Sequence, residues 1–318
     1  GPSFRLLELE REFDAEKTAV VDVGICGAIP LLETHASYCS EKEDDTERIR
    51  CIKDSLSSNI GGSRHEKVLL RQLLGVILLS AAAPFSDTHL YDGEPRTLTD
   101  SCYLIRNGDR YLLWDAGLPA ALKGTSATQW VFTLSVEKTI AEQLAQIDVA
   151  PADVTYIGIS HYHDDHIGQA AGFPDAELLI GRGDAEAVAS GQMEATRAQL
   201  APWLADGASG KVTRITADHD VFGDGSVRMV AMHGHTPGHK SLVVELPQSG
   251  TFMLTGDLYH FEEQIENKGV PVFNTDRADT LASFHRFDQM ADNLDATVVI
   301  QHDPRHLGRL PTFPKSAR

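Results

Sequence analysis

Five side chains that could bind a metal ion lie within six consecutive residues near the middle of the chain. The segment is His161, Tyr162, His163, Asp164, Asp165 and His166. It directly follows residues 154–160, a short apolar run of the type that forms a buried strand. Leaving five polar groups without partners at the end of such a strand would be costly in desolvation. A divalent metal ion supplies the partner, because imidazole and carboxylate groups are ligands that zinc accepts.

The order of these residues, H-x-H-x-D-H, resembles the signature of the metallo-β-lactamase superfamily. That family also carries a Gly-His-x-Pro-Gly-His turn, a carboxylate after a strand and a late histidine after the final strand. The sequence has matching residues at His235, Asp257 and His302, in the family's order. The four blocks together cover roughly residues 100–305, so the resemblance extends over most of the C-terminal part of the chain.

The resemblance implies an α/β fold, a four-layer αβ/βα sandwich with the site at the shared edge of its sheets. It also implies two divalent metal ions, which we expect to be zinc, with iron, manganese and cobalt as alternatives. Carried over position by position, the ligands of the first metal are His161, His163 and His235, those of the second are Asp165, His166 and His302, and Asp257 bridges the two. His239 is expected to orient the ligand turn. Asp115 is expected either to hydrogen-bond near the site or to be a plain turn residue.

Two metal ions that share a carboxylate hold a bridging hydroxide, because their summed charge lowers the pKa of water to about 7. We therefore expect metal-assisted hydrolysis, in which this hydroxide attacks a carbonyl group. The expected catalytic residues are Asp165, Asp257 and His260, with Asp257 passing a proton to the leaving group. His260 stands where the lactonases of the family place a tyrosine against the substrate carbonyl, and it could donate a hydrogen bond there instead.

Among the branches of the family, the chain most resembles the N-acyl homoserine lactonases. The spacing of 22 residues from His235 to Asp257 and of 45 residues from Asp257 to His302 is similar to theirs. We expect a bacterial, quorum-quenching hydrolase that opens lactone rings. Two alternatives remain: a glyoxalase II-like thioesterase or broad esterase, and a persulfide dioxygenase-like enzyme with a single iron. Because position 260 is not tyrosine, the substrate could also be a different ester.

Five aromatic residues lie beside the ligand blocks or in a polar-flanked loop before the first long helix. They are Trp130, Phe132, Tyr162, Phe261 and Phe273. Each could line a pocket for an acyl chain or pack in the core.

Strands and helices alternate through residues 101–300, as an α/β fold requires. Helical spacing predicts helices over residues 136–147, 184–190 and 279–294. Short β-rich apolar runs predict strands over residues 102–106, 110–114, 154–160, 176–180, 227–232, 241–245, 251–254 and 297–300. Residues 191–210 show weak periodicity and are expected to form an exposed insertion.

The chain has 318 residues, with 28 Lys and Arg against 46 Asp and Glu, and a formal charge of -18. This charge argues against binding to nucleic acid and to anionic membranes, since both need clustered basic residues. No run of about 18 apolar residues that could span a bilayer is present. The expected partner is therefore a small-molecule lactone or ester, and the chain could also form a homodimer.

Residues 1–85 differ from the rest and are expected to be an N-terminal extension of unknown role, before a hydrolase domain over residues 86–318. Within them, residues 65–84 resemble a secretory signal peptide, because two basic residues precede an apolar run of about ten that ends in three alanines. Such a peptide normally stands at the start of a chain, so a buried helix is the alternative. The signal-peptide interpretation favours a periplasmic or secreted protein over a cytoplasmic one.

Overall fold

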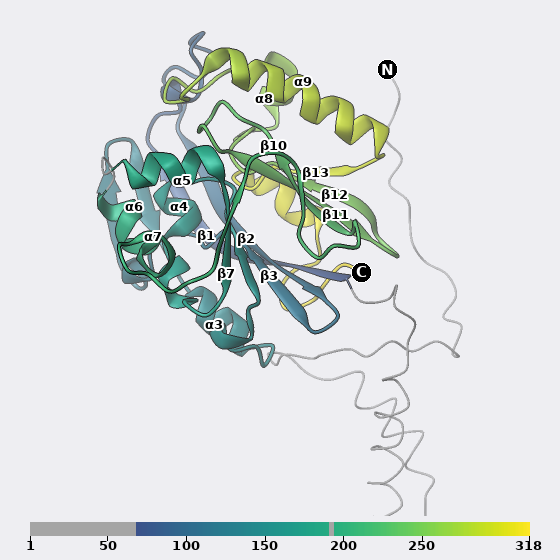
Figure 1. The fold of residues 1–318 in the computed structure, drawn as a ribbon. Helices are drawn as coiled ribbons and strands as arrows, with labels where there is room; N and C mark the ends of the chain where they lie inside the picture. The colour runs from purple at the N-terminus through teal and green to yellow at the C-terminus, as the bar shows by residue number, and fades with distance from the viewer. Residues whose placement is uncertain (1–67, 191–193) are drawn as a thin grey trace, which may run out of the picture. The chain divides into compact units, whose positions relative to one another are not determined.

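The structure is a computed structural model that describes residues 68–190 and 194–318. Two β-sheets form its centre, with helices on their outer faces (Figure 1). The larger sheet contains β1 (Val68–Leu79), β2 (Arg96–Asn107), β3 (Arg110–Trp114), β4 (Ser126–Gln129), β5 (Phe132–Ser135), β6 (Tyr156–Gly158), β7 (Glu177–Gly181) and β8 (Val212–Ile215). The smaller sheet contains β9 (His219–Asp220), β10 (Val227–Ala231), β11 (Lys240–Leu246), β12 (Gly250–Leu254) and β13 (Thr297–Val299). The helices are α3 (Ile140–Ala145), α4 (Asp164–Ile167), α5 (Arg182–Ala189), α6 (Glu194–Gln199), α7 (Ala201–Leu204), α8 (Glu263–Asn267) and α9 (Arg277–Asn293).

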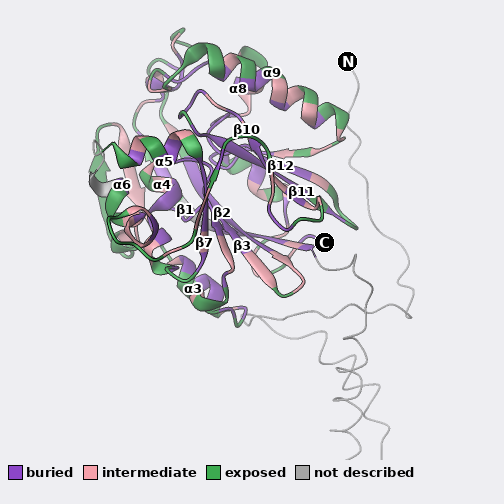
Figure 2. Cartoon of the chain, in the orientation of Figure 1, coloured by how far each residue is buried: buried purple, intermediate pink, exposed green. Residues whose placement is uncertain are grey.

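The two sheets pack face to face around an apolar core. Tyr103 and Trp114 from the larger sheet share this core with Met229 and Leu242 from the smaller sheet, and all four are fully buried. A second core lies between the larger sheet and helices α3, α4, α5 and α7, and a third lies between the smaller sheet and α9. Figure 2 shows the buried residues concentrated on the central strands. The four layers are helix, sheet, sheet and helix, which confirms the predicted αβ/βα sandwich.

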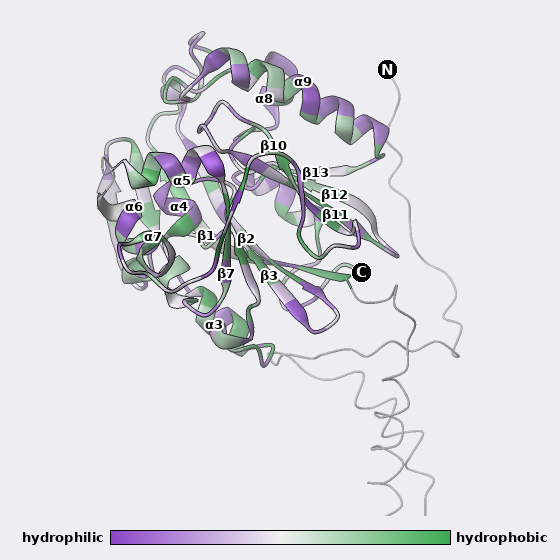
Figure 3. Ribbon diagram, in the orientation of Figure 1, coloured by the Kyte–Doolittle hydropathy of each residue, from purple (hydrophilic) through white to green (hydrophobic). Residues whose placement is uncertain are grey.

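Strands β2 and β3 are buried on both faces, which explains why apolar residues follow one another along them. Tyr103 and Ile105 face the smaller sheet, whereas Cys102 and Leu104 face the helices. Figure 3 shows hydrophobic residues along these central strands, and hydrophilic residues predominate along α9. The hydropathy pattern therefore follows the order of the layers.

The order and direction of the strands bring the ligand-bearing loops together. In the larger sheet the order is β4-β5-β1-β2-β3-β6-β7-β8, and the last four strands run parallel. In the smaller sheet the order is β13-β12-β11-β10-β9, and β12 and β13 are parallel. The loops after β6, β12 and β13 therefore leave the sheets at carboxyl ends of parallel strands, which is where α/β folds place their sites.

Residues 68–79 form strand β1, and not the helix or leader peptide that the sequence suggested. β1 pairs antiparallel with the full length of β2 and, along its last four residues, with β5. Because β1 lies between β5 and β2, its removal would divide the larger sheet. Its side chains Leu70 and Leu73 are fully buried. Strand β1 pairs with β2 inside the larger sheet, so the predicted boundary after residue 85 is also wrong. The rest of the prediction for residues 1–67 lies outside the described residues.

Residues 194–210 also differ from the predicted exposed insertion. They contain α6 and α7, and both Leu200 and Trp203 are buried. Nε1 of Trp203 donates a hydrogen bond to the carbonyl oxygen of Ala176 (2.8 Å). Helices of six and four residues are too short for a hydrophobic period to show in the sequence.

The other predicted helices and strands are confirmed, with shifted ends. Within the two described ranges, no helix has the length and apolar character needed to cross a bilayer.

Candidate metal centre

All seven side chains predicted to bind metal come together beside the carboxyl ends of the strands. The loop after β6 and the short helix α4 carry four of them, and the loops after β10, β12 and β13 carry one each. Within the described residues they form two groups, and in each group the potential ligand atoms lie within 4.8 Å of one another. The first group is His161, His163, His235 and Asp257, and the second is Asp165, His166 and His302.

Two glycines allow the ligand-bearing turns to form. Gly256, directly before the aspartate of the first group, has a φ of 57°, and a Cβ there would lie 2.7 Å from Nε2 of His239. Gly234, directly before the third histidine of that group, has a φ of 127°, and a Cβ there would lie 2.3 Å from the backbone nitrogen of Thr280. Any other residue would be strained by the positive φ and would clash, so both turns require glycine.

In the first group, three imidazole nitrogens face one another. Nε2 of His235 lies 3.1 Å from Nε2 of His161 and 3.0 Å from Nδ1 of His163, and the latter two atoms are 2.8 Å apart. Tetrahedral ligands at about 2.0 Å from a zinc ion are about 3.3 Å from one another, so these separations approach those of a metal site. Burial lowers the pKa of His161 far below its ordinary value and that of His163 to about 3. Both rings are therefore neutral at neutral pH, which is the form that binds a metal ion.

The second group contains two histidines and one aspartate. Nε2 of His166 lies 3.2 Å from Nε2 of His302, and oxygens of Asp165 lie 3.9 Å and 3.8 Å from these two nitrogens. Both histidines are buried, whereas the side chain of Asp165 is 26% exposed. The second group is therefore open to solvent on the side of Asp165.

The carboxylate of Asp257 lies between the two groups. Its Oδ1 is 2.9 Å from Nε2 of His302 and 3.0 Å from Nε2 of His166. Its Oδ2 is 3.3 Å from Nε2 of His235 and 3.6 Å from Nε2 of His161. Burial opposes ionisation of Asp257, but the surrounding histidines, His166 first among them, outweigh burial and hold the pKa well below its ordinary value. An ionised carboxylate with one oxygen toward each group can bridge two cations.

Hydrogen bonds from outside the second group orient its histidines. Nδ1 of His166 lies 2.9 Å from Oδ2 of Asp115, and Nδ1 of His302 lies 2.7 Å from the carbonyl oxygen of Thr99. In both rings Nδ1–H is the donor, which leaves Nε2 to face the cluster. Asp115 has a φ of 59° and also accepts a hydrogen bond from the backbone nitrogen of Ser160 (2.6 Å). It is therefore both a turn residue and a hydrogen-bonding support of the site.

The first group is supported by a hydroxyl and by a side-chain amide. Nδ1 of His161 lies 3.0 Å from Oγ of Ser160, and Nδ1 of His235 lies 2.8 Å from Oδ1 of Asn274. Asn274 could not be predicted from the sequence, because it lies 39 residues after His235 in a segment without a motif.

His239 lies behind the first group and belongs to neither ligand group. Its Nδ1–H donates to the carbonyl oxygen of Met232 (2.9 Å), and its Nε2 accepts from the backbone nitrogen of Asp257 (3.0 Å). The structure thus places His239 where it orients the bridging carboxylate.

His260 is buried beside the bridging carboxylate. Its Nε2 lies 3.1 Å from Oδ2 of Asp257, and its ring is stacked on that of His302 with 5.7 Å between the ring centroids. Its backbone N–H donates to Oε1 of Gln264 (2.6 Å), whose Nε2 donates to the carbonyl oxygen of Phe85 (3.0 Å). Burial lowers the pKa of His260 to about 4, so the ring is neutral at neutral pH and carries one N–H donor.

The neighbouring tyrosine does not face the site. Tyr259 stacks on Phe284 with 4.5 Å between the ring centroids, and its hydroxyl donates to Oδ1 of Asp288 (2.8 Å). Its ring belongs to the core between the smaller sheet and α9. Of Tyr259 and His260, only His260 lies at the site.

A row of aromatic side chains leads from His260 toward the surface. Phe85 packs edge-on against His260 with 4.8 Å between the ring centroids, and Phe132 packs against Phe85 at 6.2 Å. Trp130 packs against Phe132 at 5.8 Å and is 66% exposed. Of the other predicted aromatic residues, Phe261 and Phe273 also pack on Phe85, whereas Tyr162 belongs to the core under the helices. Phe85 was missed because its segment resembled the end of a leader peptide.

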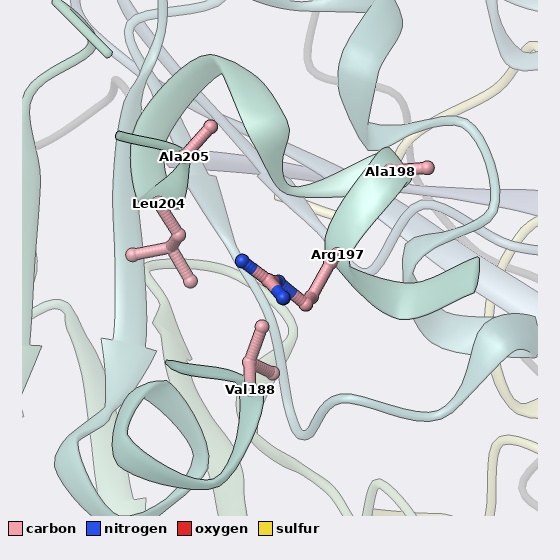
Figure 4. Close-up of a pocket in the computed structure, with 5 residues that line it drawn as sticks. All are labelled: Val188, Arg197, Ala198, Leu204 and Ala205. Carbon is pink, nitrogen blue, oxygen red and sulfur yellow. The ribbon is translucent and has the colours of Figure 1, made fainter. Parts of the chain in front are cut away.

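A separate cavity of about 250 Å³ lies between α5, α6 and α7 (Figure 4). Its lining residues are Val188, Arg197, Ala198, Leu204 and Ala205. None of them belongs to either ligand group, so this cavity is not part of the metal centre.

The part of the chain that carries the ligand residues matches a known protein family. The family model described as Metallo-beta-lactamase superfamily matches residues 96–302. The chain belongs to the metallo-β-lactamase superfamily. The matched span contains every residue of both ligand groups.

Several members of the superfamily that resemble this chain are N-acyl homoserine lactonases. The lactonase AttM of Rhizobium radiobacter is 33% identical over 174 residues, which are 54% of this chain but only 66% of AttM. The N-acyl homoserine lactonase of a Bacillus sp is 28% identical over 234 residues, which are 71% of this chain and 90% of that protein. A solved N-acyl homoserine lactone hydrolase, with the product N-hexanoyl-L-homoserine bound at its catalytic metal center, is 25% identical. It superimposes with a TM-score of 0.67 and covers 80% of this chain and 100% of its own.

Proposed function

We propose that this protein is a dinuclear metal hydrolase that opens the ring of N-acyl homoserine lactones, a quorum-quenching reaction. The observation that carries the proposal is the carboxylate of Asp257, with one oxygen toward each of two groups of ring nitrogens. The substrate class is taken from the similar lactonases described above.

The donor set fits two divalent ions, which we propose to be zinc. Imidazole nitrogen with one or two carboxylates is a usual zinc environment, although iron, manganese and cobalt accept the same donors. The first ion would be held by His161, His163 and His235, the second by Asp165, His166 and His302, and both by Asp257.

Bound at these residues, two such ions would supply an activated water molecule and polarise the lactone carbonyl. The ionised carboxylate of Asp257 can take up a proton and pass it to the leaving alkoxide, because its oxygens lie at the centre of the site. Nε2 of His260, 3.1 Å from that carboxylate, can donate a hydrogen bond to the oxygen on which negative charge develops. Asp165 completes the second group on the side that is open to solvent.

The outer end of the aromatic row offers a binding surface for the acyl chain. Phe85 is buried behind it, whereas Phe132 is half-buried and Trp130 is 66% exposed. Covering apolar surface there stabilises a complex by about 25 cal/mol per Å². We propose that the lactone ring lies over the bridging carboxylate and that the acyl chain extends toward Phe132 and Trp130.

Metal analysis combined with hydrolysis of N-hexanoyl homoserine lactone tests the proposal. We expect two metal ions per chain and acid release that a pH indicator follows. His302→Ala should lose the second ion and lower turnover by at least about a hundredfold, since the metal pair carries much of the barrier reduction. The matched control is His285→Ala, because His285 is an exposed histidine on α9 and its removal should change neither measurement.

The same experiment separates the alternatives. Two ions per chain without lactone opening would support a metal-dependent hydrolase but exclude the lactone as its substrate. A thioester or another ester would then be the expected substrate, in line with His260 at the position of the lactonase tyrosine. One iron per chain would favour the persulfide dioxygenase-like reaction. Near-normal turnover of His302→Ala would refute the assignment of the ligands.

A further inference from the structure

His235 can bind a metal ion through Nε2 in only one of its two neutral tautomers. Nε2 faces the first group, 3.0 Å from Nδ1 of His163, and Nδ1 lies 2.8 Å from Oδ1 of Asn274. With the proton on Nδ1, the lone pair of Nε2 is directed at the cluster. With the proton on Nε2, that proton occupies the place of the metal ion. Whatever fixes the tautomer therefore decides whether the first metal can bind.

The amide of Asn274 is oriented by a threonine of α9. Oγ1 of Thr280 lies 2.6 Å from the carbonyl oxygen of Asp276, and the hydroxyl donates its single proton there because a carbonyl can only accept. The hydroxyl oxygen then accepts from Nδ2 of Asn274, 3.0 Å away. The amide oxygen is thereby turned toward His235, and it requires a proton on Nδ1.

Backbone contacts hold these side chains in place. The backbone nitrogen of Thr275 donates to the carbonyl oxygen of His235 (3.1 Å), and that of Asp276 donates to the carbonyl oxygen of Gly234 (2.9 Å). The absence of a side chain at Gly234 lets the fully buried Thr280 approach the ligand turn. The start of α9 and the turn that carries His235 are thus joined by both backbone and side-chain hydrogen bonds.

The other ligand histidines are supported differently. His166 faces the carboxylate of Asp115, and His302 faces a backbone carbonyl, so each meets an acceptor whatever the orientation of its partner. His161 faces a serine hydroxyl, which can donate or accept. Of these four histidines, His235 is the one that depends on which end of a side-chain amide is presented to it.

We propose that Asn274 and Thr280 are positioning residues for the first metal ion. Thr280 orients the amide of Asn274, and the amide oxygen holds His235 in the tautomer that binds. This inference rests on the proposed function, because it takes His235 to be a metal ligand. Loss of such an outer hydrogen-bond partner lowers metal affinity by about 10- to 100-fold.

Two matched pairs of variants of the full chain separate hydrogen bonding from packing. Thr280→Val keeps the shape and removes the hydroxyl, whereas Thr280→Ser keeps the hydroxyl. Asn274→Leu removes the amide, whereas Asn274→Asp keeps an oxygen that accepts from His235. Each variant is titrated with zinc against a chelating indicator, and the histidine ring nitrogens are observed by ¹H–¹⁵N NMR.

Asn274→Leu and Thr280→Val should bind one of the two zinc ions about 10- to 100-fold more weakly and lose the Nδ1–H signal of His235. Asn274→Asp and Thr280→Ser should retain both ions with affinities close to those of the unmodified chain. Equal zinc affinity in all four variants, or an unchanged His235 signal, would overturn the inference. Should Asn274→Leu fail to fold in a thermal melt, the Thr280 pair decides, because valine and threonine have nearly the same shape.

The zinc titration also distinguishes this inference from the proposed function. If the chain binds two zinc ions but opens no lactone, the proposed substrate is wrong and the proposed role of Asn274 still stands. A chain that binds no zinc overturns both.

Discussion

Replacing His260 with phenylalanine removes one hydrogen-bond donor from the proposed active site while keeping its packing. His260 is 2% exposed, with its ring edge-on to Phe85 at 4.8 Å and stacked on that of His302 at 5.7 Å between ring centroids. A phenyl ring fits the same space, so both ligand groups should keep their metal ions. The change that matters is the loss of Nε2, which lies 3.1 Å from the carboxylate of Asp257.

The size of the effect follows from these surroundings. Removing one donor aimed at developing charge in a buried site lowers kcat by about 10²–10³-fold, or about 2.7–4 kcal/mol. Burial lowers the pKa of His260 to about 4, so it is a neutral donor, and burial also keeps competing water away. We expect kcat to fall about a hundredfold with KM changed less than about threefold, because the acyl-chain contacts remain.

The assay measures acid release from N-hexanoyl homoserine lactone, with metal content determined on the same preparation. Lower kcat at two ions per chain would support the role of His260 as a donor. His260→Tyr, which introduces the residue that the lactonases carry there, should recover part of kcat. An unchanged kcat in His260→Phe would refute the reasoning, and loss of one metal ion would show that His260 is a ligand instead.

Three further predictions test other parts of the structure. Leu73→Ala in the buried part of β1 should lower the free energy of unfolding in urea by about 2–5 kcal/mol, and Leu78→Ala on the same strand, 47% exposed, by less than about 0.5 kcal/mol. Similar losses in both would contradict the placement of β1. Burial raises the pKa of Asp184 to about 7. Between about pH 4 and pH 7 the folded chain therefore binds more protons than the unfolded chain, so the free energy of unfolding should fall as pH rises. Asp184→Asn should flatten that slope in unfolding experiments across this range, and an unaltered slope would exclude Asp184 as its source. Trp130→Ala should raise KM more for decanoyl than for butanoyl homoserine lactone, and equal changes would place the acyl chain elsewhere.

The ligand groups could be predicted from the sequence because each block is local. Residues 161–166 supply four of the seven side chains in one turn, and the other three stand directly after strands whose apolar runs are recognisable. Strand β1 could not be predicted in the same way. Its apolar run is equally typical of a helix or a leader peptide, and it is a strand because Val68 to Leu79 pair with residues 96–107. That pairing is a property of the sheet and not of the segment.

The supporting residues also depend on contacts between distant segments. Asn274 reaches His235 only because α9 packs against the ligand turn, and Phe85 reaches His260 across 175 residues of sequence. The residue type gave no signal either, since asparagine and phenylalanine are common in turns and cores. A supporting amide becomes visible only when a ring nitrogen is seen to lie within hydrogen-bond distance of it.

The carboxylates gathered around the two ligand groups favour a cationic partner. Asp165 and Asp257 belong to the ligand groups, and the carboxylate of Asp115 lies directly behind them. Asp100 is also buried nearby, and burial, followed by the charge of Asp165, raises its pKa to about 7. Gathering carboxylates in the interior is unfavourable unless cations compensate them. Burial opposes protonation of His166 and His302, but the charge of Asp257 outweighs burial, raising the pKa of His302 to about 9 and that of His166 well above its ordinary value. These two rings therefore carry positive charge beside the carboxylates, and two divalent ions bound at the ligand groups would supply that compensation in their place.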